Sequence, residues 1–410
     1  MNTSASASSW ESIEAPPRAR AFRATLPRVR IFAGEGALGH LRKVVVEASC
    51  RRVMVLSGQS VARGTPLIST ITSALGEGCA GTFDRIGRNA TRGSLEEAVS
   101  LARSVSCDGI VAVGAGTAMV FGRLLAILMA EGRPAEEICT RYRDGAPPET
   151  RRLPAAKVPI FNVLTAPTNA QGRGGSALVD PEQGRLEFFD PKTRPTALFW
   201  DPEALMTAPL SLTCSNARTT YFWALMGMAS AARANPLVEG VRRQAYMLAR
   251  SARGAEHLAQ ARIDLCAAAW LHNSDEDLGG APFVAHWIVR VCYAIGAGLA
   301  TLSDQVRLGD IYNSIVPHAM RHLEPLCRSE IMRMAETIAG RTVADCEAAR
   351  GIIRADLTAS GPLVRLRDVL TEEGQLDAVL ASAMRAYNAD PNGEFKTRAA
   401  ELHAILRDAW

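Results

Sequence analysis

The stretch Gly109–Ile127, GIVAVGAGTAMVFGRLLAI, decides the fold class of this chain. A continuous apolar run leads into a tight turn of Gly114, Ala115, Gly116 and Thr117, and a helical run follows. An apolar run without polar alternation is typical of a strand in a parallel sheet that is covered on both faces. Glycines in such a turn let backbone N–H groups approach an anion at the positive end of the helix dipole. The turn matches neither GxGxxG nor a Walker A motif, so by itself it indicates either a phosphate site or a structural turn.

Short apolar runs alternate with helical runs on both sides of this stretch. Strands are predicted at Arg28–Phe32, Arg52–Ser57, Gly81–Ile86, Gly109–Val113 and Val158–Val163. Helices are predicted at Thr65–Leu75 and Ser94–Ser104, and the second begins with a capping-box pattern of Ser94 and Glu97. Alternating strands and helices predict βαβ units and a parallel sheet.

The composition changes after about Asp201, where β-type runs nearly vanish and long stretches rich in Ala, Leu and Arg begin. Helices are predicted at Arg218–Ala234, Leu237–Ala261, Ile263–Leu271, His286–Leu299 and Leu366–Tyr387. Between them, the acidic segment HNSDEDLGG from His272 is interpreted as a loop, either a solvated turn or a divalent-cation site. We therefore predict a disordered tail at residues 1–22, an α/β domain at 23–200 and an α-helical domain at 201–410.

Composition and charge exclude several classes of protein. Hydrophobic residues make up 48% and the formal net charge is only +4, which argues against a disordered chain. No run of five or six like charges and no basic stripe interleaved with aromatics occurs, so nucleic-acid binding is not expected. The longest helical apolar run, Leu124–Ala130, is too short to span a bilayer, and the N-terminus has no signal-like apolar region. Nine cysteines without a CxxC pair predict free, mostly buried thiols in a reducing cytoplasm.

A second stretch rich in Gly and Thr, Leu164–Pro181 (LTAPTNAQGRGGSALVDP), follows one of the predicted strands. Its small side chains and hydroxyls suit the lining of a cofactor site. An ordinary connecting loop is the equally weighted alternative.

The order of several segments resembles the iron-containing alcohol dehydrogenase superfamily, and within it the maleylacetate reductase branch. The similar segments are Gly114–Thr117 (the family's GGGS), Pro167 to Gly175 (PTT…GSE), Asp201-Pro202, Ala217-Arg218, Ala269–Leu271 (AWL), Val289–Ala297 (HKLCHVLGG) and Arg307–His318 (PHAETHAVVLPH). The resemblance implies a Rossmann-like parallel sheet followed by an all-α domain, the dehydroquinate synthase-like architecture. It also implies NAD or NADP as cofactor, a small-molecule substrate and a cytoplasmic homodimer. The residues expected at the dinucleotide are Ser57, Gly114, Ala115, Gly116, Thr117 and Thr168.

The resemblance implies a metal held by one Asp and three His in the family, and this sequence departs from it at all four positions. They fall on Tyr221, Leu225, Val289 and Leu308. Aliphatic side chains cannot ligate Fe²⁺ or Zn²⁺. We therefore expect no metal.

Without a Lewis acid, other groups must stabilise the alkoxide that develops during carbonyl reduction. Tyr221 or Tyr293 can donate the proton, and Arg218 or Arg290 can hold a carboxylate or an oxyanion. The alternative for the tyrosines is core packing with a satisfied hydroxyl. For the arginines it is an ordinary ion pair at the surface.

Three functions remain open at this point. The first is a metal-independent NAD(P)H-dependent reductase acting on a carbonyl or enone-like group of a small, carboxylate-bearing substrate. The second is a repurposed lyase, hydrolase or isomerase, which is favoured by Ala115 in place of a family glycine and by Val120 and Arg123 where many relatives have Asp and Lys. The third is a catalytically silent homologue.

Overall fold

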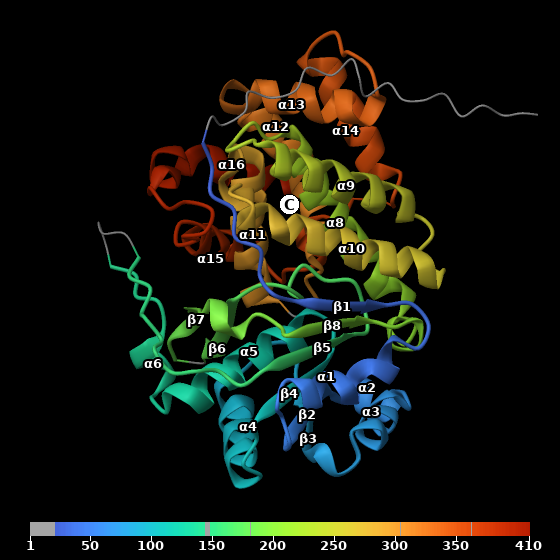
Figure 1. The fold of residues 1–410 in the computed structure, drawn as a ribbon. Coiled ribbons are helices and arrows are strands. Elements are labelled where there is room, and N and C mark those ends of the chain that lie inside the picture. Colours follow the sequence, from blue (N-terminus) through green and yellow to red (C-terminus); the bar gives the residue numbers. More distant parts are fainter. Residues whose placement is uncertain (1–20, 144–147, 181, 304, 362) are drawn as a thin grey trace, which may run out of the picture. The chain divides into compact units, whose positions relative to one another are not determined.

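The computed structural model describes residues 21–143, 148–180, 182–303, 305–361 and 363–410. They form two compact units (Figure 1). The sheet unit consists of Pro27–Ala217 and Gly254–Asn273, and the helical unit of the described part of Met1–Leu26 with Arg218–Arg253 and Ser274–Trp410. The units thus interleave along the chain, whereas the sequence places a single boundary near residue 200. Residues 1–20 of the predicted tail lie outside the described residues.

The sheet unit is built on six parallel strands in the order β1-β8-β5-β4-β2-β3 (Figure 1), which confirms the predicted parallel sheet. The strands are β1 Arg30–Ala33, β2 Val53–Gly58, β3 Cys79–Ile86, β4 Gly109–Gly114, β5 Ile160–Leu164 and β8 Ala197–Trp200. The helices that begin in this unit are α1 Leu41–Glu47, α2 Gln59–Gly64, α3 Leu67–Leu75, α4 Arg92–Ser104, α5 Gly116–Glu131, α6 Ala135–Ile138, α7 Pro202–Leu205, α8 Leu210–Ala229 and α10 Ala259–Asp277.

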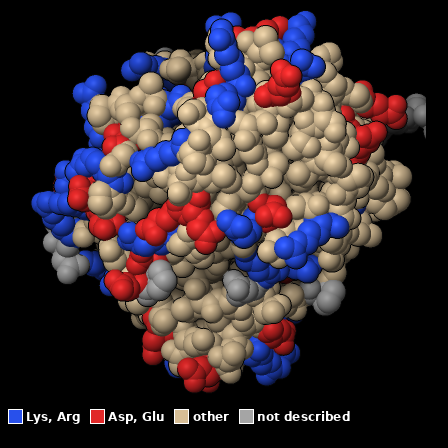
Figure 2. Space-filling view, turned by 90° about the horizontal axis from the view of Figure 1, so that it is seen from below, with Lys and Arg blue, Asp and Glu red and all other residues tan. Residues whose placement is uncertain are grey.

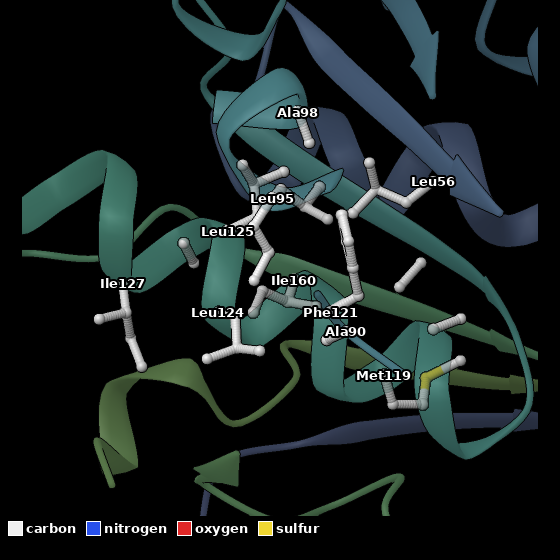
Figure 3. Close-up of a cluster of buried hydrophobic side chains, with 14 of the residues drawn as sticks. Leu56, Ala90, Leu95, Ala98, Met119, Phe121, Leu124, Leu125, Ile127 and Ile160 are labelled. Atoms are coloured by element: carbon white, nitrogen blue, oxygen red, sulfur yellow. The ribbon is translucent and has the colours of Figure 1, made fainter. Parts of the chain in front are cut away.

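Both faces of the sheet are covered, which explains the unbroken apolar sequence of β4. Successive strand side chains point to opposite faces. Ile110 and Ala112 pack in one buried cluster with residues of α4 and α5, some of which Figure 3 shows. Val111 and Val113 pack in a second cluster with residues of α1 and α3. Each large apolar side chain buried in this way contributes roughly 1.5–3 kcal/mol.

Two local predictions in the sheet unit are wrong. The stretch Leu164–Pro181, interpreted as a loop, contains strand β6 (Gly175–Asp180), which pairs antiparallel with β7 (Gly184–Phe189). The expected capping box of Ser94 is absent, because α4 begins at Arg92 and Thr91 is its N-cap residue. The hydroxyl of Ser94 instead donates to the carbonyl of Thr91 at 3.1 Å.

The helical unit contains parts of α8 and α10 and seven further helices among its described residues. These are α9 Pro236–Ala252, α11 Trp287–Leu302, α12 Leu308–His322, α13 Glu324–Ala339, α14 Cys346–Thr358, α15 Gln375–Ala383 and α16 Ala399–Ala409. The single helix predicted at Leu366–Tyr387 is wrong. Only a short 3-10 turn, Leu366–Asp368, and α15 form there, and the intervening segment ends at Gly374.

The acidic segment at His272 is also not a loop. Helix α10 continues through it to Asp277. Within the helical unit, Asp275 is almost completely buried and forms an ion pair with Arg242 of α9. Burial is tolerated here because the guanidinium of Arg242 also donates to the carbonyl of Ser230 at 3.1 Å. The tertiary partner, which local composition does not reveal, keeps this part of the chain helical.

The cysteines, the surface charges and the helix lengths bear on the expectations drawn from composition. All nine cysteines lie in the described part of the chain and are free thiols, and seven of them are buried. On the face drawn in Figure 2, Lys and Arg side chains lie beside Asp and Glu side chains. Within the described residues, no helix has the length and apolarity needed to cross a bilayer.

Candidate cofactor site and catalytic residues

The sheet order creates a switch point between β2 and β4. These strands are adjacent and parallel, with Leu56 opposite Ala112. Helix α3, after β2, packs in one core cluster, and α5, after β4, packs in the cluster on the other face. In open α/β sheets, ligands bind where such connections diverge, at the carboxyl ends of the strands. Ser57 and Gly114, the predicted cofactor residues at the ends of β2 and β4, lie at this edge.

The backbone of the turn requires glycine at position 114, and Gly116 is closely packed. Gly114 has φ +152°, and a Cβ there would lie 2.8 Å from the Cβ of Ala118. A Cβ on Gly116 would lie 3.1 Å from Oγ1 of Thr168. The loop after β5 therefore packs directly against the first turn of α5, which places Thr168 beside the glycine turn.

The N-terminus of α5 is open to an anion. Ala115 is the N-cap residue, and no described side chain caps the helix. Its first N–H groups therefore supply the donors and the dipole that attract phosphate. The hydroxyl of Thr117 donates to the carbonyl of Arg88 at 2.9 Å, so its proton holds the loop after β3 against this helix.

A network of buried amides fixes the loop after β5, and sequence analysis missed it. The side chain of Gln171 is fully buried and donates from Nε2 to the carbonyl of Cys266 at 2.8 Å. Oε1 of Gln171 accepts from Nε1 of Trp200 at 2.8 Å, and the backbone carbonyl of Gln171 accepts from Nδ2 of Asn162 at 3.0 Å. No sequence signal marks these residues, because the contacts join β5, β8 and α10.

Arg123 of α5 fixes the same loop from the helix side. Its Nη1 donates to the carbonyl of Ala170 at 2.7 Å and its Nε to the carbonyl of Gly175 at 3.0 Å. The side chain is buried, and burial, with Arg173 nearby, lowers its pKa to about 9. The guanidinium therefore stays cationic at neutral pH, next to the loop that contacts the glycine turn.

A cavity of about 530 Å³ in the sheet unit lies away from the turn. It is lined by Thr91, Arg92, Gly93, Glu96, Glu136, Asp180, Glu182 and Gln183. Arg92 pairs there with Asp180 and, at 3.0 Å, with Glu136. Arg92 is the one basic residue of this lining and faces four acidic ones, so the cavity is net acidic and unsuited to a phosphate. The switch point is therefore the better candidate.

In the helical unit, the candidate acid Tyr221 is committed to a structural contact. Its hydroxyl donates to Oδ2 of Asp356 at 2.8 Å, and Arg253 binds the same carboxylate at 2.7 and 3.0 Å. The guanidinium of Arg253 also lies 4.2 Å from the centre of the Tyr221 ring. Burial, with Tyr246 and Asp356 nearby, raises the pKa of Tyr221 well above its usual range. A proton held this firmly is a poor one for catalysis.

The second candidate acid, Tyr293 of α11, lies in an aromatic cluster. Its ring centre is 5.8 Å from that of Trp223 and 5.1 Å from that of Phe283, with edge-to-face geometry in both pairs. The side chain is only partly buried. Aromatic walls with a partly exposed phenol suit a proton donor to a small substrate better than the enclosed hydroxyl of Tyr221 does.

Both candidate arginines form ion pairs, in different surroundings. Arg218 pairs with Asp310, donates from Nε to the carbonyl of Ser360 at 3.1 Å and is about a quarter exposed. Arg290 is buried, and its Nη2 lies 2.7 Å from carboxylate oxygens of both Asp390 and Glu394. The carboxylates of Asp390 and Glu394 occupy the end of the Arg290 guanidinium to which a substrate anion would bind. Arg218, which pairs with one carboxylate, is the more available cation.

The residues at the positions to which the family resemblance assigns metal ligands offer no ligand set for a metal ion. Leu225 and Val289 are fully buried aliphatic side chains, Leu308 is partly exposed, and the hydroxyl of Tyr221 is bonded to Asp356. Over the part of the chain that the structure describes, no group of three or more His, Cys, Asp or Glu side chains gathers as metal ligands do.

Comparison with known proteins agrees with this architecture. Residues 27–202 match the family model described as iron-containing alcohol dehydrogenase. The chain is 24% identical over 389 residues to a maleylacetate reductase of Pseudomonas sp. (strain P51), covering 93% of this chain and 95% of that protein. The resemblance to the iron-containing alcohol dehydrogenase superfamily, in its maleylacetate reductase-like branch, is confirmed.

Solved structures of this superfamily share the fold. Maleylacetate reductase from Rhizobium sp. strain MTP-10005 superposes with a TM-score of 0.69 at 17% identity, covering 96% of this chain and 99% of that one. NADH-dependent butanol dehydrogenase A from Thermotoga maritima superposes with a TM-score of 0.77 at 18% identity, covering 97% and 100%. The predicted class, an α/β parallel-sheet region plus a helical region, is thereby confirmed.

Proposed function

We propose that the chain is a metal-independent, NAD(P)H-dependent reductase that acts on a carbonyl or enone-like group of a small, carboxylate-bearing substrate. The observation that carries the proposal is the open N-terminus of α5 at the switch point, with Ser57, the glycine turn and Thr168 at one edge of the sheet. The relatives named maleylacetate reductase and 4-hydroxybutyrate dehydrogenase support the oxidoreductase class and a substrate with a carboxylate.

The site residues divide into two sets under this proposal. The backbone of Gly114, Ala115, Gly116 and Thr117 holds the pyrophosphate of the dinucleotide, and Ser57 and Thr168 flank it. A reduced nicotinamide supplies the hydride when it is bound. A cytoplasmic homodimer remains a prediction from the family resemblance.

The helical unit supplies the polar catalytic groups in this proposal. Tyr293 donates the proton to the developing alkoxide, in the role that a Lewis-acidic metal has elsewhere. Arg218 holds the substrate carboxylate. Tyr221 and Arg290 support the fold through Asp356 and through Asp390 with Glu394, respectively.

Cofactor titration tests the proposal. The purified protein is treated with chelator and titrated with NADH and NADPH while nicotinamide fluorescence is followed. We expect binding of at least one of them in the micromolar range. Gly114→Ala should abolish it, because the new methyl would collide with Ala118, while Gly132→Ala, also at positive φ but in open space at the other end of α5, should retain it.

Failure of both nucleotides to bind the wild-type protein would rule out the reductase. It would favour the non-redox lyase, hydrolase or isomerase, or the catalytically silent homologue.

A further inference from the structure

Three asparagines of the sheet unit, Asn162, Asn169 and Asn273, bury side-chain polar atoms that have no hydrogen-bond partner, and the last two are in contact. In Asn169, in the loop after β5, both Oδ1 and Nδ2 are buried without a partner. In Asn273 of α10, which is 8% exposed, Oδ1 has none. An unpaired buried polar group costs about 1–3 kcal/mol, so such atoms are uncommon and need an explanation.

The side chain of Asn273 is in contact with the backbone of Asn169. Nδ2 of Asn273 donates to the backbone carbonyl of Asn169 at 2.9 Å. A carbonyl accepts only from a donor, so this contact determines which end of the Asn273 amide is nitrogen and which is the unpaired oxygen. Thr168, the neighbour of Asn169, packs against the first turn of α5 at Gly116. The pair therefore adjoins the glycine turn to which we assign the dinucleotide.

The unpaired atoms of Asn169 and Asn273 define the chemistry of a ligand. They are two acceptor oxygens, one from each of these asparagines, and one amide donor from Asn169. A carboxylate offers only acceptors and would be repelled by the two oxygens. A carboxamide offers two N–H donors and one acceptor, which matches the set.

We propose that Asn169 and Asn273 form a receptor for a neutral carboxamide group. The group comes either from the nicotinamide ring of the dinucleotide or from an amide-bearing substrate. The first source rests on the proposed cofactor site, and the second does not.

The test compares ligands with and without the carboxamide on wild-type protein and on Asn169→Leu, with Asn388→Leu, at an exposed position of the helical unit, as control. The probes are NADH, ADP-ribose, which lacks the nicotinamide, and succinamate, a small amide. If the nicotinamide is the source, Asn169→Leu weakens NADH binding at least tenfold and leaves ADP-ribose within twofold. If a substrate is the source, both nucleotides are unaffected and only succinamate binding is lost.

Stability provides an independent readout. Asn169→Leu removes two unpaired polar atoms, so its Tm should equal or exceed that of the wild type although binding is lost. Unchanged binding of all three probes overturns the proposal. So does an equal loss of NADH and ADP-ribose, which would indicate a displaced loop.

The proposed function and the receptor can fail separately. If the wild type binds neither nucleotide, the reductase proposal is refuted. Binding of succinamate is then the remaining test of the carboxamide receptor. Binding of succinamate that Asn169→Leu abolishes then supports the receptor, and absence of binding refutes it.

Discussion

At the scale of single residues, the two candidate tyrosines differ in what their hydroxyls do. Tyr221 donates to a buried carboxylate, whereas the contacts of Tyr293 are ring contacts with Trp223 and Phe283. Both were equal candidates from sequence. Only the long-range partner Asp356, 135 residues away, separates their roles.

Phenylalanine substitutions test this division. Tyr293→Phe should lower kcat about 100-fold with little change in stability, since the proton donor is lost. Tyr221→Phe should keep kcat within about threefold and lower the free energy of unfolding by about 1–2 kcal/mol, since the bond to Asp356 is lost. Steady-state kinetics and urea unfolding measure both. The opposite pattern would show that Tyr221 is the acid.

His286, the N-cap residue of α11, predicts a pH dependence of stability. Burial lowers its pKa to about 4, and its Nδ1 is buried without a partner. The unfolded chain, with a pKa near 6.5, therefore binds more protons than the folded protein between pH 6.5 and 4. Above pH 6.5, His286 is neutral in both states and makes its full contribution to the free energy of unfolding. As the pH falls from 6.5 toward 4, this contribution is lost, and the free energy of unfolding decreases by about 3 kcal/mol in total.

Urea unfolding at pH 7, 6, 5 and 4.5 measures this loss. His286→Gln does not titrate, so its curve should be flatter than that of the wild type over this range. Curves of equal slope would assign the acid sensitivity to other groups.

At the scale of elements, the connection between α5 and the loop after β5 decides the geometry of the candidate cofactor site. Arg123 donates to two carbonyls of this loop, and Gln171 fixes it to β5, β8 and α10. The strand–turn–helix at β4 could be predicted because its signals lie within twenty residues. The loop could not, because its hydrogen-bond partners come from elements far apart in sequence.

Arg123→Lys should loosen this loop. An ammonium lacks the planar fork that reaches both carbonyls, so one of them is left without a donor. We expect a loss of about 1–2 kcal/mol of stability and several-fold weaker NADH binding. Arg133→Lys, just after α5, is the matched control, because its exposed pair with Glu137 should contribute little. Equal effects of both substitutions would contradict the role given to Arg123.

At the scale of the whole molecule, the prediction is independence from metal. Leu225 and Val289, at two of the positions to which the family resemblance assigns metal ligands, are fully buried. Dialysis against EDTA should therefore leave kcat/KM within twofold, and added Fe²⁺ or Zn²⁺ should not raise it. Metal analysis of the dialysed protein is the control. Activity that EDTA abolishes and Fe²⁺ restores would place a metal in the reaction after all.

The sequence by itself determined the features that depend on neighbours along the chain. These are the buried strand and glycine turn at Gly109–Thr117, the alternation that builds a parallel sheet, and the helical second half. Only the tertiary structure decided which partner each polar side chain has. It continued α10 through an acidic segment by pairing Asp275 with Arg242 and joined Arg290 to Asp390 across 100 residues. The physical reason is that periodicity and turn chemistry are local, whereas the partner of a buried polar group depends on which distant elements pack against it.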